Sequence, residues 1–266
     1  MLFTAPSFYR CLLSAALLLP FFAVADDDAA SKGLSIAQTM KERDRGWKDN
    51  SAELLMILRN HAGSESEREM RVQSLEVQGD GDKSMTIFDT PRDVKGTAFL
   101  SFTHSQQPDD QWLYLPALKR VKRISSKNKS GPFMGSEFAY EDMSSFEVDK
   151  YSYRWLRDEK YENQLCYVLE TLPLDKFSGY TRIDVWIDQV EYRPLKMDFY
   201  DRAGKLLKTL TLHDYKQYLG QYWRSGKQLM INHKNSKATE IHMKNQQFGM
   251  GLNESDFTAN SLKRAR

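Results

Sequence analysis

The sequence has very little cysteine and almost no net charge, and these two shortages exclude whole classes of protein. Only Cys11 and Cys166 are cysteines in a chain of 266 residues, so a framework of several disulfides is excluded. We expect Cys166 to be a small buried residue on a strand and not a reactive thiol. The formal net charge is +2, far from the strongly basic balance of a nucleic-acid-binding protein. We therefore expect no nucleic-acid partner.

The chain also lacks the short motifs that build common catalytic and metal sites. It has no G-x-S-x-G elbow, P-loop, G-x-G-x-x-G turn or H-E-x-x-H helix. His233 and His242 could approach one another across a hairpin, but two histidines without a placed carboxylate are a weak indication of metal. We predict that the protein is not an enzyme and has no catalytic residues, no metal site and no cofactor. A hydrolase whose residues assemble from distant parts of the chain is the alternative.

The first residues have the composition of a secretory signal peptide. Arg10 supplies a short positive region, residues 12–24 are apolar, and residues 23–25 form a small-residue cleavage site. The apolar stretch is shorter than the roughly 20 residues that a spanning helix needs. We therefore predict a cleaved signal peptide over 1–25, followed by one exported, soluble domain over 26–266.

An amphipathic helix is predicted directly after this peptide. Ile36, Ala37, Met40 and Trp47 share one helical face over residues 34–47, with charged side chains mostly opposite. Such a helix could pack on an ordinary core or cover a cavity, and the pattern favours neither.

The rest of the chain has the rhythm of an antiparallel sheet. Apolar alternation recurs at intervals of about 8–12 residues with Gly, Pro, Asn and Ser between, which indicates curled or barrel-like antiparallel strands. No helix long enough for a parallel crossover intervenes. The predicted strands are 51–61, 67–77, 85–88, 97–104, 112–115, 119–124, 151–156, 165–172, 180–187, 195–200, 206–213, 227–233 and 239–243.

Each strand has one apolar face that something must cover. Ile183, Val185 and Ile187 share such a face. The opposite face of the same strand, expected to be solvated, carries Arg182, Asp184, Trp186 and Asp188. Few segments are available as covers, so the sheet either fills its own interior or leaves a cavity for a ligand, and both remain open.

The segment 112–143 combines an apolar strand, a basic run and a polar stretch with spaced aromatic residues. Its basic residues are Lys119, Arg120, Lys122 and Arg123. They could be a solvated edge strand protected by charge. They could also be a docking face for anionic lipid headgroups or an acidic partner, and their position beside the apolar loop slightly favours this.

The sequence resembles the bacterial outer-membrane lipoprotein-sorting proteins, relatives of the periplasmic lipoprotein carrier. The resemblance covers most of the chain after residue 25 and rests on PRDVKG at 91–96, WLYLPALKRVKRI at 112–124 and FMGSEFAYEDM at 133–143. Shorter matches are WID at 186–188 and YRP at 192–194.

This resemblance implies a mainly β fold, an open antiparallel half-barrel with a few short helices and a lid loop closing its mouth. It also implies a hydrophobic cavity for acyl chains and a location in the Gram-negative periplasm. Exporters of the resistance-nodulation-division type are implied as possible inner-membrane partners. The chain is longer than the lipoprotein carrier and lacks its lid-tethering motif, so the cargo stays open between lipoprotein, free lipid and another hydrophobic molecule.

We therefore predict a periplasmic carrier or chaperone of lipidated cargo that touches membranes only peripherally or transiently. The alternative is an accessory or sensor subunit that docks an exporter and carries nothing. The residues expected to line the lipid cavity or its lid are Met40, Trp112, Tyr114, Leu115, Phe133, Met134, Phe138 and Tyr140. Lys119, Arg120, Lys122 and Arg123 are expected to form the headgroup or partner face.

Overall fold

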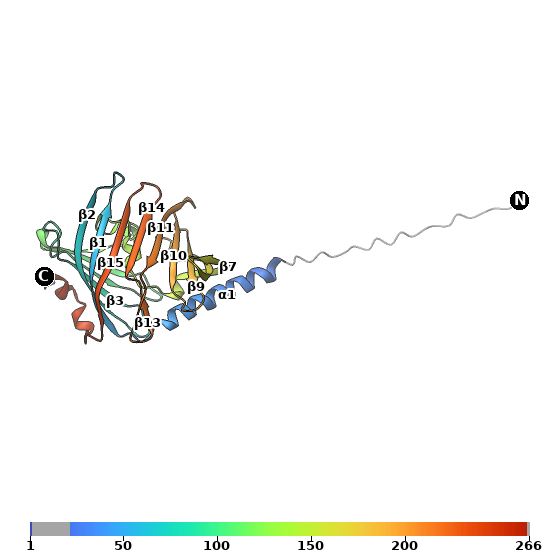
Figure 1. The fold of residues 1–266 in the computed structure, drawn as a ribbon, viewed down its shortest axis with the longest axis horizontal. Helices are drawn as coiled ribbons and strands as arrows, with labels where there is room; N and C mark the ends of the chain where they lie inside the picture. The colour runs from blue at the N-terminus through green and yellow to red at the C-terminus, as the bar shows by residue number, and fades with distance from the viewer. Residues whose placement is uncertain (2–21, 265–266) are drawn as a thin grey trace.

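A single curled sheet dominates the computed structural model, which describes residue 1 and residues 22–264, with side chains from residue 27 on (Figure 1). The predicted signal peptide, 1–25, lies almost wholly outside the described residues. The first helix is α1 (Phe22–Arg43). The strands are β1 (Asp49–Arg59), β2 (Glu65–Leu75), β3 (Lys83–Phe88), β4 (Ala98–Phe102), β5 (Asp110–Leu115), β6 (Arg120–Ile124), β7 (Tyr151–Tyr161), β8 (Gln164–Pro173), β9 (Arg182–Asp188), β10 (Pro194–Tyr200), β11 (Leu206–His213), β12 (Lys216–Tyr218), β13 (Tyr222–Arg224), β14 (Lys227–Asn232) and β15 (Ala238–Phe248), and the last helix is α2 (Ala259–Arg264).

The thirteen strands of the main sheet follow the order β6-β5-β4-β3-β2-β1-β15-β14-β11-β10-β9-β8-β7. All the neighbouring strands in this order run antiparallel, and the sheet is not closed into a barrel, since β6 and β7 are its two edges. The predicted half-barrel is thus confirmed, and so are the predicted strands. The short hairpin β12–β13 forms a separate sheet that the sequence analysis did not anticipate.

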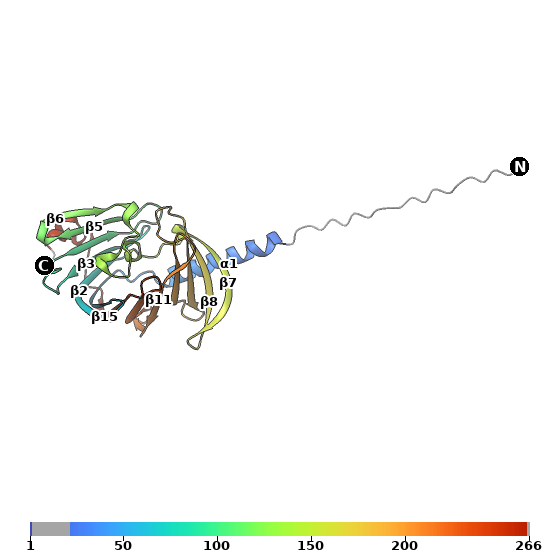
Figure 2. The ribbon, with the colours of Figure 1, turned by 90° about the horizontal axis from the view of Figure 1, so that it is seen from above.

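The order of the strands explains where the segment after β6 must lie. The chain runs outward from β1 to one edge at β6, resumes at the opposite edge with β7, and returns strand by strand to β15 beside β1. Residues 125–150, which we call the crossing segment, therefore have to cross the open side of the sheet. Figure 2 shows this segment within the curve of the sheet.

The helix α1 differs from its predicted limits of 34–47. It already includes Phe22, because the stretch that follows is rich in alanine, the best helix former. It ends at Arg43, ahead of Gly46, which has a φ of +96°. Trp47 consequently lies beyond the helix, where it is buried. Within the described residues, no helix combines the length and apolarity needed to cross a bilayer.

Apolar residues pack on both faces of the sheet. The largest cluster joins the concave face to α1 and the crossing segment. A second cluster lies on the convex face, where Phe257 and Leu262 of the C-terminal tail cover β3, β4 and β5. The third, smaller cluster surrounds Trp186.

The expectation of a solvated outer face on β9 is wrong. Asp184, Trp186 and Asp188 are all buried there. Asp188 accepts a hydrogen bond from Arg193 Nε at 2.9 Å, and the Lys196 ammonium lies 4.0 Å from the Trp186 ring centroid. The side chains of Arg193 and Lys196 thus cover this face of β9. Strand alternation alone does not reveal such a cover.

Candidate functional site

An apolar cavity of about 640 Å³ lies on the concave side of the sheet. This volume is typical of small-molecule sites. Its floor consists of inward side chains of β8, β9, β10, β11 and β14, among them Leu169, Val185, Met197, Leu210 and Met230. These residues point inward because alternate positions of a strand face the same side. The cavity can therefore take a flexible apolar chain without any specific polar contact.

The crossing segment fills the other half of the concave side with aromatic side chains. Phe133 is fully buried, and its ring centroid lies 5.1 Å from that of Phe99 and 5.6 Å from that of Tyr140. Edge-to-face packing of this kind adds to the free energy of burial. This part of the segment is a packed wall beside the cavity.

A buried ion pair fixes this wall to the sheet. Lys208 Nζ on β11 lies 2.7 Å from Asp142 Oδ2 and donates a hydrogen bond of 3.0 Å to the carbonyl of Glu137. Tyr180 Oη donates to Asp142 Oδ1 at 2.8 Å. Burial, reinforced by the Asp142 charge, raises the pKa of Tyr180 well above its ordinary value, so the phenol remains a donor. The crossing segment is thus attached where the cavity wall meets the sheet.

Among the described residues, the helix α1 forms fewer hydrogen bonds with the sheet than the crossing segment does, and it closes the cavity from the β7 side. Its main neighbour is β7, and a Cβ on the buried Gly33 would stand only 2.8 Å from the backbone nitrogen of Trp155. Lys41 Nζ pairs with Glu147 at 2.9 Å, and Met40 contributes to the cavity wall. The first turns of α1 project beyond the sheet (Figures 1 and 2). Of the two covers, α1 is therefore the one with fewer attachments.

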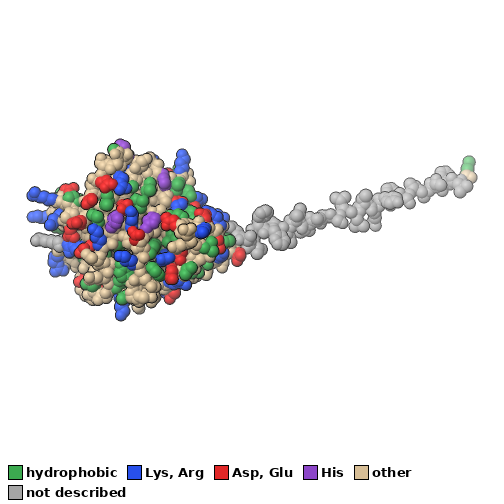
Figure 3. Space-filling model, viewed as in Figure 1, with side chains coloured by type: hydrophobic (Ala, Val, Ile, Leu, Met, Phe, Trp, Pro, Cys, Tyr) green, Lys and Arg blue, Asp and Glu red, His purple; other side chains and the backbone are tan. Residues whose placement is uncertain are grey.

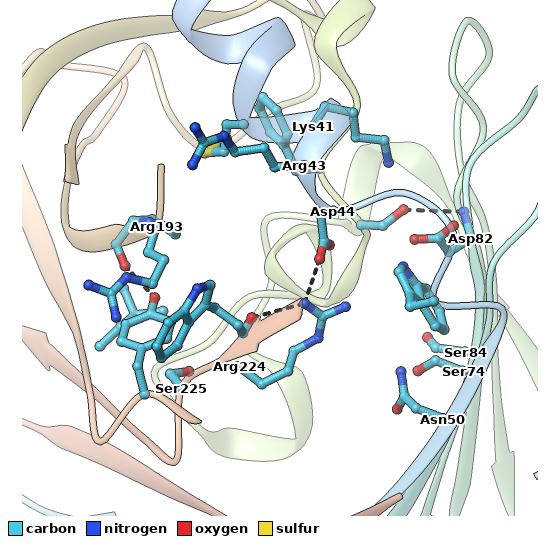
Figure 4. A pocket seen from close by; sticks show the side chains of 18 of the residues that line it. Lys41, Arg43, Asp44, Asn50, Ser74, Asp82, Ser84, Arg193, Arg224 and Ser225 are labelled. Atoms are coloured by element: carbon cyan, nitrogen blue, oxygen red, sulfur yellow. Dashed lines mark hydrogen bonds and ion pairs between the residues drawn. The ribbon is translucent and has the colours of Figure 1, made fainter. Parts of the chain in front are cut away.

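A second cavity of about 760 Å³ adjoins the first, and we call it the polar cavity because charged and polar residues outnumber the apolar ones in its lining, although apolar side chains supply much of its surface. Both cavities share lining residues, including Met40, Phe146 and Leu212. Figure 4 shows the polar cavity with Arg193 and Arg224 on one side and a wall of Asn50, Ser74, Ser84 and Asp82 on the other. An apolar and a polar compartment in contact suit a ligand that has both kinds of surface.

Three solved structures share this architecture. An outer membrane lipoprotein-sorting protein domain from Vibrio parahaemolyticus is 61% identical, with a TM-score of 0.87 over 88% of this chain and 100% of that chain. The chain belongs to the outer-membrane lipoprotein-sorting protein family. The family model that matches residues 80–264 is described as "Uncharacterized protein". No curated protein matches the chain.

The other two similar structures are more distant. A DUF1329 family protein from Desulfovibrio piger is 28% identical, with a TM-score of 0.84 over 88% of this chain and 99% of that chain. A LolA superfamily protein from Nitrosomonas europaea is 21% identical, with a TM-score of 0.69 over 86% of this chain and 98% of that chain, and it supports the fold alone.

The sequence-predicted cavity residues of this lipoprotein-sorting family member fall into three groups. Met40 and Phe138 line the apolar cavity. Leu115, Phe133, Met134 and Tyr140 belong to the concave core cluster. Trp112 and Tyr114 pack on the convex face under the C-terminal tail and line neither cavity, so we remove them from the candidate site. A contact between the other residues and a ligand stays a prediction.

The predicted basic face lies on the edge strand β6 and the turn before it. Lys119, Arg120, Lys122 and Arg123 are all exposed, and Arg123 pairs with Asp110. Lys and Arg side chains project from the end of the molecule that carries the C-terminus (Figure 3). Charged side chains on an open edge oppose pairing with another strand. A partner for this face stays a prediction.

The predicted site omitted the floor of the cavity. The alternation in 180–187 placed Ile183 and Val185 on an apolar face, and the same pattern in 195–200 was the other available indication. What the sequence could not show is which of these faces is left uncovered by the chain itself.

Cys166 is fully buried on β8, which confirms the expected small buried residue on a strand, and burial raises the pKa of its thiol to about 11. Among the described residues, no group of three or more His, Cys, Asp or Glu side chains could hold a metal ion.

Proposed function

We propose that this protein is a periplasmic carrier that binds lipoprotein acyl chains or other lipid in its apolar cavity and passes them towards the outer membrane. The observation that carries the proposal is the apolar cavity of about 640 Å³ between the sheet and α1. Membership of the lipoprotein-sorting family supports the same cargo class. Burial in the cavity would stabilise a bound chain by about 0.8 kcal/mol per CH₂.

Entry and release would take place at α1. The crossing segment is tied down by the Asp142–Lys208 pair, whereas α1 rests mainly on β7. Burial of an alkyl chain has no directional switch of its own, so a partner would have to displace the cover. The exposed basic residues of β6 and its preceding turn are our candidates for contact with that partner or with anionic lipid headgroups.

Native mass spectrometry of protein purified from a periplasmic extract tests the carrier role. We expect copurified lipid or lipidated protein that is lost in Leu210→Trp, since this side chain on β11 lines the cavity and is only 8% exposed. Leu206→Trp on the same strand is the matched control, because Leu206 is 41% exposed and does not line the cavity.

Wild-type protein that is always empty, yet binds an inner-membrane exporter, would instead favour the accessory subunit. Lipid that copurifies equally with both tryptophan variants would show that the ligand binds elsewhere.

A further inference from the structure

We propose that the polar cavity beside the apolar one holds a phosphate-bearing head group of the lipid whose chains occupy the apolar cavity. This inference rests on the proposed carrier function and specifies its ligand as a phospholipid-like amphiphile. The polar cavity is the site shown in Figure 4.

Three arginines from distant parts of the chain meet in this cavity. Arg43 is the last residue of α1, Arg193 lies in the turn before β10, and Arg224 ends β13. A guanidinium group matches phosphate geometry because its N–H donors form a planar fork. Each of these arginines lies beside a carboxylate, and together they line one wall of the cavity from three separate elements.

Aromatic rings hold two of these guanidinium groups in place. The Arg193 guanidinium carbon lies 4.5 Å from the Trp223 ring centroid, and that of Arg43 lies 4.6 Å from the Tyr192 centroid. Stacking restricts the rotamers of a long side chain, so less conformational entropy remains to be lost when an anion binds. The wall is therefore partly preorganised for a ligand.

The protein's own bonds leave donors available on two of the three arginines, whereas Arg193 donates from Nε to Asp188 and from Nη2 to Gln164. Arg43 Nη1 donates to the carbonyl of Val190 at 2.6 Å, and Arg224 Nη1 donates to the Trp223 carbonyl at 2.9 Å and pairs with Asp44. Each guanidinium has five N–H donors. For Arg43 and Arg224, the partners found among the described residues all bind Nη1, which leaves Nε and Nη2 for a ligand.

The facing wall carries one carboxylate, Asp82, near Lys41, and its other polar side chains suit the remaining atoms of such a head group. Asn50 of β1, Ser74 of β2 and Ser84 of β3 line it. Their amide and hydroxyl groups both donate and accept hydrogen bonds, as the glycerol and ester oxygens of a lipid head group require.

The two cavities adjoin at residues that they share. Met40, Phe146 and Leu212 line both of them. A ligand with one apolar and one anionic end can therefore lie across this junction with each end in the matching environment. The rival explanation is that the arginines serve only their own ion pairs, with Asp44, Asp188 and Glu191, and that no anion binds.

Two lipids with the same acyl chain separate these explanations. Lysophosphatidylglycerol carries the phosphate and monoacylglycerol does not, and binding of each is measured by displacement of a fluorescent fatty acid. We expect the phosphate to increase affinity about 10-fold, and Arg43→Gln to abolish that preference while keeping monoacylglycerol affinity. Arg157→Gln is the matched control, because its side chain is 51% exposed against 47% for Arg43, forms a surface ion pair and lines neither cavity.

Equal affinity of the wild-type protein for the two lipids, or an unchanged preference in Arg43→Gln, would overturn the head-group site and leave the carrier function standing. Failure of both lipids to bind would overturn both proposals. A third arm adds inorganic phosphate alone. Competition by phosphate at concentrations similar to those of the lipid would assign the arginines to free phosphate, against a lipid head group.

Discussion

Replacement of Lys208 by methionine tests whether the crossing segment is a fixed wall of the cavity. Methionine keeps most of the length of the side chain and removes its charge. Lys208 and Asp142 have side chains only 4% and 9% exposed, so the variant leaves a buried carboxylate without its partner. Breaking a buried pair in this way costs about 3–5 kcal/mol. The hydrogen bond from Lys208 to the carbonyl of Glu137 is lost as well.

Urea unfolding followed by tryptophan fluorescence measures this cost. We expect the midpoint to fall strongly in Lys208→Met and to recover in part in Lys208→Met/Asp142→Leu, since an apolar pair avoids the buried charge but leaves the Tyr180 hydroxyl without its acceptor. Arg59→Met is the control, because the Arg59–Glu65 pair is exposed on both sides, with side chains at 39% and 44%. Its removal should cost about 1 kcal/mol or less.

Hydrogen exchange at residues 137–142 supplies the second readout. Exchange there should accelerate in Lys208→Met and remain slow in Arg59→Met. A loss below about 1 kcal/mol for Lys208→Met, with unchanged exchange, would refute the fixed wall. The crossing segment would then be the movable lid that the sequence predicted, and α1 would lose its assignment as the cover that opens.

Burial, opposed by Lys41 and reinforced by Glu147, raises the pKa of Asp82 to about 6. The folded protein thus binds the proton of the Asp82 carboxyl group more tightly than the unfolded chain does. Ionisation of Asp82 therefore lowers the free energy of unfolding above pH 6, and this destabilisation disappears towards pH 4. Asp82→Asn should therefore raise the free energy of unfolding at pH 8 by up to about 3 kcal/mol and change it little at pH 4. Urea titrations at the two pH values measure this difference, and an equal effect at both would contradict the prediction. Gly33→Ala places a methyl group 2.8 Å from the Trp155 backbone nitrogen, so α1 should move away from β7. A bound fluorescent fatty acid should then dissociate faster in stopped-flow measurements. An unchanged dissociation rate would argue against α1 as the cover. Phe257→Ala empties a site that is 2% exposed and should cost about 3–5 kcal/mol by thermal unfolding, without altering lipid binding, because this side chain covers the convex face.

The strands were predictable because their information is local. Alternation with turn residues between the runs marks β11 at Leu206–His213 and β10 at Pro194–Tyr200 within about a residue. The helix α1 was less predictable, since its alanine-rich beginning has no apolar stripe to mark it.

The site was less predictable than the strands, because alternation divides a strand into two faces without saying which face is concave. Trp112 and Tyr114 therefore looked equivalent to Leu113, yet they pack under the C-terminal tail while Leu113 joins the concave core. The Asp142–Lys208 pair joins residues far apart in the chain, so no local pattern announces it.

By itself, the sequence determined that the chain forms an antiparallel curled sheet with few segments available to cover it, because periodicity and turn chemistry act over neighbouring residues. Only the tertiary structure decided that the crossing segment fills half of the concave side and leaves an apolar cavity beside three arginines. Empty volume and convergent charge depend on how distant side chains pack together, and no stretch of sequence contains that relation.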